Sequence, residues 1–287
     1  MMTKKSINFK SGLAIAAICL VSLSACRKEK DEASADNDTS TSIENAVADA
    51  AYNDVANIAD QAYTGSVSTY RSAGDEGILS SCASVSFDTL STPKSFTVDF
   101  GTSNCLGNDG NYRRGKIIVT YTGAYRDSGS SHTITFDSYY VNDNNIAGSK
   151  TVTNTGRNNA GHLTYSISIN GSITWDPQTF GGGGTSTYTA NRTREWSEGE
   201  STQIWADDVY LISGTSSGTT RTGASYTANT VSPLKKYINF RYITDGTLAF
   251  TPSGKYTRYI NFGYSNAAKD NLAQVTINGY TFVVQLK

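Results

Sequence analysis

From Cys82 onward, apolar and polar residues alternate with a period of two in run after run. The clearest run is 163–174, where Leu163, Tyr165, Ile167 and Ile169 are each followed by a threonine, a serine or an asparagine. This period predicts β-strands with one face against a core and the other face in water. A chain with this pattern over most of its length folds as sheet.

Polar turns separate these runs, and no helical pattern interrupts them. Short connections join antiparallel neighbours, whereas parallel strands need long crossovers. We therefore expect an all-β fold: a long antiparallel meander of about 12 to 15 strands, as a curled sheet or a two-layer sandwich. The turns are Asp127–Ser130, Asp143–Asn145, Asn158–Gly161, Gly181–Gly184 and Ser213–Gly218.

One segment, 43–63, has helical periodicity. Its apolar residues, from Ile43 to Ala62, recur every three or four positions and share a face. We expect this N-terminal helix to pack its alanine-rich face on the sheet. Asp49 and Asp54 fall mostly on other faces of the predicted helix.

The composition limits the function classes. Charged residues make up only 17% of the chain and the formal net charge is −1, so no basic field predicts a nucleic-acid partner. The 18 tyrosines and abundant Ser, Thr and Asn are typical of strands with hydroxyl-rich faces. No cofactor is predicted.

The first residues have the parts of an export signal: Lys4 and Lys5, then an apolar run over 12–23. That run is shorter than the roughly 20 residues that a spanning helix needs, although a membrane-spanning anchor is the alternative interpretation. The sequence Leu23-Ser24-Ala25-Cys26 resembles the bacterial lipobox. The resemblance implies a signal peptide over 1–25, cleavage before Cys26, and lipid attachment to Cys26 that anchors the chain to a membrane.

Residues 26–42 are polar and predict a flexible tether before a single β-rich domain over 43–287. The charged segment 27–32 resembles the signal that directs Bacteroidota lipoproteins to the outer face of the outer membrane. Its Lys-Asp-Glu lies further from the cysteine than in that signal, and a plain charged linker is the alternative. The expected location is the outer membrane, with surface exposure as one option.

Two further cysteines, Cys82 and Cys105, predict a disulfide, because exported chains meet oxidising conditions. It would stabilise the fold by roughly 3 kcal/mol in the chain-entropy treatment. A catalytic thiol is not expected, since no histidine lies near either cysteine in sequence.

Five motifs stand out: Asp99-Phe100-Gly101, Cys105, Asp109-Gly110, Arg114–Ile117 and Asp270–Gly279. Together they resemble a group of Bacteroidota outer-membrane lipoproteins of unknown function. The resemblance covers most of residues 80–287 and implies no assigned activity. Members of that group often have a second cysteine pair, and this chain departs from them because Lys269 stands where one partner would be.

Trp175, Trp196 and Trp205 are candidates for a glycan-stacking surface, although sheets also use aromatic rings for cross-strand packing. Asp99 and Asp109, near Cys105, are weak calcium candidates, and an Asx-rich turn is the simpler interpretation.

Asp207-Asp208 has the residue type of half a glycosidase carboxylate pair, or of a solvated strand end. His132 and His162, the only histidines, are too few to predict a zinc site, so no metal site is predicted.

These features favour a non-enzymatic, lipid-anchored envelope protein that binds a protein or glycan partner or acts as a scaffold. One alternative is a glycan-binding or glycan-hydrolysing surface lipoprotein. Another is a lipid carrier, which requires an empty apolar concave face.

Overall fold

The computed structural model describes residues 40–66, 79–178, 182–202, 204, 207–240, 242–265 and 269–286, all within one compact unit, Asp36–Lys287. The predicted signal peptide, Cys26, the tether up to residue 39, and Trp205 lie outside the described residues. Within the described part, no helix has the length and apolarity to cross a bilayer.

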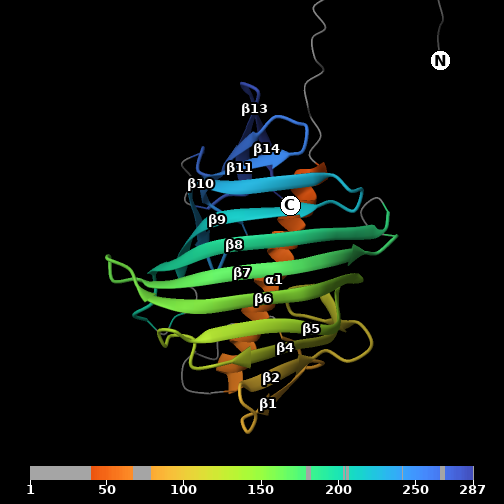
Figure 1. Cartoon of the computed structure of the whole chain (residues 1–287), viewed down its shortest axis with the longest axis vertical. Coiled ribbons are helices and arrows are strands. Elements are labelled where there is room, and N and C mark those ends of the chain that lie inside the picture. The colour runs from red at the N-terminus through yellow and green to blue at the C-terminus, as the bar shows by residue number, and fades with distance from the viewer. Residues whose placement is uncertain are drawn as a thin grey trace, which may run out of the picture. The chain divides into compact units, whose positions relative to one another are not determined.

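The strands form one antiparallel sheet in which nearly every strand pairs with the strand before it in sequence (Figure 1). β1 and β14 are the two edge strands and do not pair with each other within the described residues, so the sheet is not closed. The predicted all-β meander is confirmed, as one sheet rather than a sandwich. The strands are β1 (Ser84–Asp88), β2 (Lys94–Asp99), β3 (Cys105–Leu106), β4 (Tyr112–Tyr121), β5 (Ser131–Val141), β6 (Asn144–Arg157), β7 (Leu163–Trp175), β8 (Gly184–Glu198), β9 (Val209–Thr219), β10 (Ser225–Tyr237), β11 (Asp245–Pro252), β12 (Arg258–Asn261), β13 (Leu272–Ile277) and β14 (Tyr280–Gln285).

Register shifts interrupt the strand pairing at many points of the sheet, from β4–β5 to β10–β11. Bulges of this kind bend a strand and increase its local twist. A sheet of this size cannot stay flat, and here it curls around its helix.

The two faces of the sheet differ in chemistry. On β7 the odd-numbered side chains, such as Tyr165 and Ile169, are buried in one core with the helix α1 (Ser40–Ser66). The even-numbered positions carry Ser, Thr and Asn. We call the side that α1 covers the helix face. We call the opposite side the polar face; it runs through Thr120, Thr133, Thr151, Ser168, Asn191, Thr215 and Asn229.

The predicted helix is confirmed, but it begins at Ser40 rather than Ile43 and ends at Ser66. The predicted buried face is wrong for its first half, because Ile43 and Val47 are exposed. The buried stripe lies one position round the helix and mixes polar with apolar side chains. Its members are Thr41, Glu44, Asn45, Ala48, Tyr52, Val55, Ile58, Ala59 and Ala62.

Ionic contacts fix α1 across the sheet and explain this stripe. Asp49 and Asp54, expected on other faces of the helix, both pair with arginines of the sheet. Lys150 on β6 is fully buried and donates from Nζ to the Tyr52 carbonyl oxygen at 2.9 Å. Burial lowers the pKa of this ammonium to about 8. The ion pairs are Glu44–Arg221 (3.1 Å), Asp49–Arg192 (3.1 Å) and Asp54–Arg113 (2.8 Å).

A close approach of α1 to the sheet occurs at Tyr52. Its hydroxyl donates to the Ala147 carbonyl oxygen at 2.7 Å, and its ring stacks on Tyr188 with centroids 5.8 Å apart. The approach requires glycine on β7, because a Cβ at Gly171 would lie 1.8 Å from the Tyr52 hydroxyl oxygen. Gly171 therefore leaves the space that the tyrosine fills.

The predicted disulfide is confirmed. Cys82, just before β1, is bonded to Cys105 on β3. Cys105 is buried in the main core, so the bond holds the first edge of the sheet to its interior.

Candidate functional site

The polar face is an array of hydroxyl and amide side chains that continues from strand to strand. Register partners from Thr120 on β4 to Asn229 on β10 all carry a hydroxyl or an amide and follow one another across the sheet. Neighbouring strands lie about 4.8 Å apart, so these groups are closely spaced.

Many of the hydroxyls bond to one another across neighbouring strands. Each pair fixes two side chains and leaves lone pairs open to solvent. The pairs include Thr133–Thr151 (3.1 Å), Thr174–Thr185 (3.1 Å), Thr187–Thr219 (2.8 Å), Thr189–Ser217 (2.8 Å) and Thr276–Thr281 (3.0 Å).

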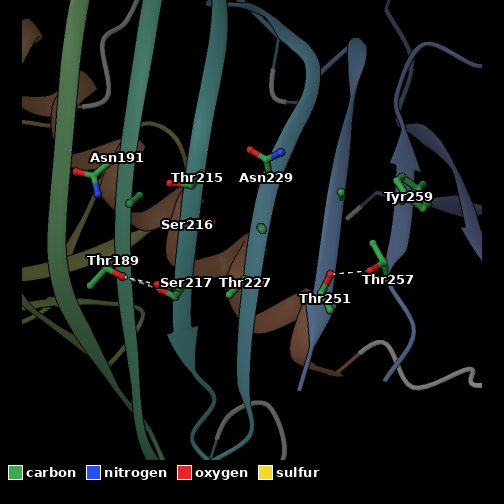
Figure 2. A pocket seen from close by; sticks show the side chains of 13 residues that line it. Thr189, Asn191, Thr215, Ser216, Ser217, Thr227, Asn229, Thr251, Thr257 and Tyr259 are labelled. Atoms are coloured by element: carbon green, nitrogen blue, oxygen red, sulfur yellow. Dashed lines mark hydrogen bonds between the residues drawn. The ribbon is translucent and has the colours of Figure 1, made fainter. Parts of the chain in front are cut away.

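A hollow of about 490 Å³ opens in the polar face over β8 to β12 (Figure 2). The Asn191 and Asn229 side chains project from its floor. Both are exposed, and neither amide has a hydrogen-bond partner among the described residues. The phenol ring of Tyr259, 49% exposed, stands at the far side of the hollow.

The hollow carries no formal charge, because Thr, Ser, Asn, Ala and one Tyr line it. The side chains that line it offer neither a carboxylate nor an amine for acid–base chemistry. They offer donors, acceptors and one aromatic ring, which suits a neutral, hydroxyl-rich ligand.

A second hollow of about 590 Å³ lies near the ends of β4 to β7. There the Arg114 guanidinium lies 3.9 Å from the centre of the Tyr140 ring and pairs with Asp143. This hollow mixes charged and polar groups and is separate from the first.

The predicted tryptophan platform is wrong for the two tryptophans that the structure describes. Trp175 is 4% exposed and its Nε1 donates to Ser186 Oγ at 2.9 Å. Trp196 is 3% exposed and lies between Tyr210 and Arg126. Both rings lie on the helix face and pack in the main core. Trp205 lies outside the described residues.

The two calcium candidates, Asp99 and Asp109, do not form a common site. Asp99 accepts the Gly101 N–H at 2.8 Å and pairs with Lys116, and the backbone hydrogen bond lowers the pKa of its carboxyl group. Asp109 instead binds Arg113 through both oxygens. Among the described residues, no three His, Cys, Asp or Glu side chains gather closely enough to hold a metal ion.

Neither carboxylate of the Asp207-Asp208 pair lines either hollow. Asp207 accepts a hydrogen bond from Thr202 Oγ1, and Asp208 is 2% exposed. The face that a lipid would need is occupied by α1.

The two histidines lie in different environments, one near the surface and one buried. His162 contacts Glu195 at 2.6 Å near the surface. His132 is buried between Tyr63, Tyr121 and Tyr125, and its Nε2 donates to the Gly123 carbonyl oxygen at 3.1 Å.

His132 is expected to make folding stability pH-dependent near its ordinary pKa. Burial lowers the pKa of its imidazole, against the Gly123 hydrogen bond and the charge of Asp60. The unfolded chain therefore binds the proton first, so stability is present above about pH 6.5 and falls on acidification through that value. Denaturant unfolding between about pH 5 and 7.5 should show this slope, and His132→Phe should flatten it. An unchanged slope in the variant would show that His132 is not the source of the pH dependence. Carboxyl groups whose pKa is lowered affect the stability at lower pH and do not interfere.

Comparisons of the chain with protein-family models, with curated proteins and with solved structures find no match. The polar face, its hollow and the sequence signals at the N-terminus are therefore the basis for a function.

Asn191, Asn229 and Tyr259 were not among the site residues predicted from the sequence, which were tryptophans, aspartates and cysteines. The sequence signal that could have identified the polar face is the polar half of the alternation along each strand. Thr, Ser and Asn at every second position mark a face, but only the register between strands brings them into one array.

Proposed function

We propose that this chain is a non-enzymatic, lipid-anchored envelope protein that binds neutral glycan on its polar face. The observation that carries the proposal is the uncharged hollow, with the free amides of Asn191 and Asn229 beside the exposed ring of Tyr259. Sugars present hydroxyl edges and flat apolar faces, which amides and aromatic rings respectively bind.

The anchor is proposed from the lipobox-like sequence that ends at Cys26, and the outer membrane from the lipoproteins that the chain resembles. Cells expressing the chain should incorporate labelled fatty acid into it, and Cys26→Ser should abolish the label and release the protein from membranes. A Cys82→Ser, Cys105→Ser variant is the control, because both of these cysteines lie in the disulfide. Label that persists in Cys26→Ser would refute the anchor. Proteolysis of intact cells would test surface exposure.

The glycan site is tested with the detergent-solubilised full chain on an array of neutral and acidic polysaccharides. Retention of neutral chains is expected. Tyr259→Ala, and separately the double variant Asn191→Ala, Asn229→Ala, should each weaken binding about tenfold or more, which corresponds to about 1.4 kcal/mol. Thr133→Ala, which removes a polar-face hydroxyl outside the hollow, should bind as the parent does. No retention of any neutral glycan, or equal retention by all variants, would refute the proposal.

A further inference from the structure

The edge strand β14 has an unpaired side. β14 (Tyr280–Gln285) pairs only with β13 among the described residues. Its Tyr280 and Val283 side chains are 71% and 52% exposed. A free strand edge presents unpaired N–H and C=O groups that another strand can bind.

β14 lacks the features that protect an edge from pairing. Its sequence, Tyr-Thr-Phe-Val-Val-Gln, has no charge, no proline and no glycine, and it consists largely of strong strand formers. The opposite edge, β1, carries the charged Asp88 at its end, and the disulfide of Cys82 lies just before its start. β14 is thus the edge better suited to pairing.

The hydrogen bonds fix which residues face outward. The Leu286 N–H donates to the Asn271 carbonyl oxygen of the chain leading into β13, at 2.7 Å. Alternate residues of a strand direct their N–H and C=O to the same side. Thr281, Val283 and Gln285 therefore direct theirs to the open edge.

We propose that β14 pairs with β14 of a second copy of this chain, antiparallel and about a two-fold axis at Val283. Thr281 then lies opposite the partner's Gln285, and Val283 lies opposite its own copy. Every outward N–H and C=O of these residues gains a partner, and no like charges meet because the strand has none. Such a contact is isologous and closes as a dimer, whereas β1 on β14 would continue as a fibre.

The pairing also covers apolar surface. Phe282 and Val284 lie on the helix face and are only partly buried. In the antiparallel register Phe282 lies opposite the partner's Val284, so the two copies extend one another's core. On the polar face the two Val283 side chains meet at the axis and shield each other from water.

Cysteine cross-linking of the detergent-solubilised full chain tests the register. Hydrogen-bonded antiparallel partners have Cα atoms about 5.5 Å apart, within the range of a disulfide. Val283→Cys should oxidise to a covalent dimer. Thr281→Cys alone should not, because its partner is Gln285, whereas the double variant Thr281→Cys, Gln285→Cys should. The parent chain under the same oxidation controls for its own cysteines.

Light scattering measures the same contact without oxidation. The parent should be dimeric. Val283→Lys, which places two ammonium groups at the axis, should raise the dimer dissociation constant at least about 100-fold. Val283→Thr should leave that constant within about tenfold of the parent value. Circular dichroism checks that each variant is folded. A parent that is monomeric up to about 100 µM would overturn the proposal. So would equal cross-linking at positions 281 and 283, or a different protein bound along β14 in cells.

Discussion

Gly171→Val is expected to displace α1 from the sheet and to lower the free energy of unfolding by about 3 kcal/mol or more. The new Cβ would lie 1.8 Å from the Tyr52 hydroxyl oxygen and 2.8 Å from the Ala147 carbonyl oxygen. Tyr52 cannot move aside, because it is fully buried and stacked on Tyr188. Denaturant unfolding monitored by circular dichroism measures the loss.

A double-mutant cycle separates this clash from a general intolerance of β7 to valine substitution. Tyr52→Ala alone should cost about 3–5 kcal/mol. In that background Gly171→Val should cost clearly less, because most of the clash is with the absent ring. Ser168→Val, on the polar face of the same strand, should stay within about 0.5 kcal/mol of the parent. Strict additivity of the two changes would show that Tyr52 does not enter the space above Gly171.

Arg113→Met is expected to cost about 3–5 kcal/mol, because it leaves two carboxylates at the helix–sheet junction without their cation. Arg113 is 1% exposed and lies 2.8 Å from Asp54 on α1 and 2.6 Å from Asp109. The arginine thus holds α1 and the β3–β4 turn together. The free energy of unfolding in denaturant measures the change.

The neighbouring arginine is the control for this prediction. Arg114 pairs with Asp143 at the surface, so Arg114→Met should cost no more than about 1 kcal/mol. Removing the carboxylates as well, with Asp54→Leu and Asp109→Asn in the Arg113→Met chain, should recover most of the loss. Equal effects of the two single arginine changes would refute the special role of Arg113.

The sheet could be predicted from the sequence because the residues that determine each strand and turn are close in sequence. Alternation along a strand such as β7 identifies its buried side, and short turns impose antiparallel neighbours. The Cys82–Cys105 bond was equally accessible, because this pair remains after the N-terminal cysteines are assigned to the signal and the anchor.

The buried face of α1 could not be predicted because its partners are distant in sequence. Glu44 accepts a hydrogen bond from the Arg221 N–H, 177 residues away, and Asp49 accepts one from Tyr188, 139 residues away. Periodicity treats such carboxylates as solvent-facing, and only a paired arginine from the β-rich part of the chain makes their burial favourable.

The candidate site was missed for a related reason. Tryptophans are conspicuous in a sequence, but Trp175 and Trp196 contribute ring area to the core. Serines, threonines and asparagines are individually uninformative, and their arrangement as Asn191, Thr215 and Asn229 exists only after three strands take their register.

The position of α1 before all the described strands in sequence has a kinetic consequence. Each hairpin of the meander joins segments close in sequence, and such contacts form quickly. The docking surface of α1, in contrast, is complete only when Arg221, beyond β9, is in place. Of the described elements, α1 is thus synthesised before the sheet but is among the last to dock, and until then the growing sheet exposes the apolar side that α1 will cover. Folding should therefore show rapid strand formation followed by a slower phase in which Tyr52 and the buried ion pairs become protected.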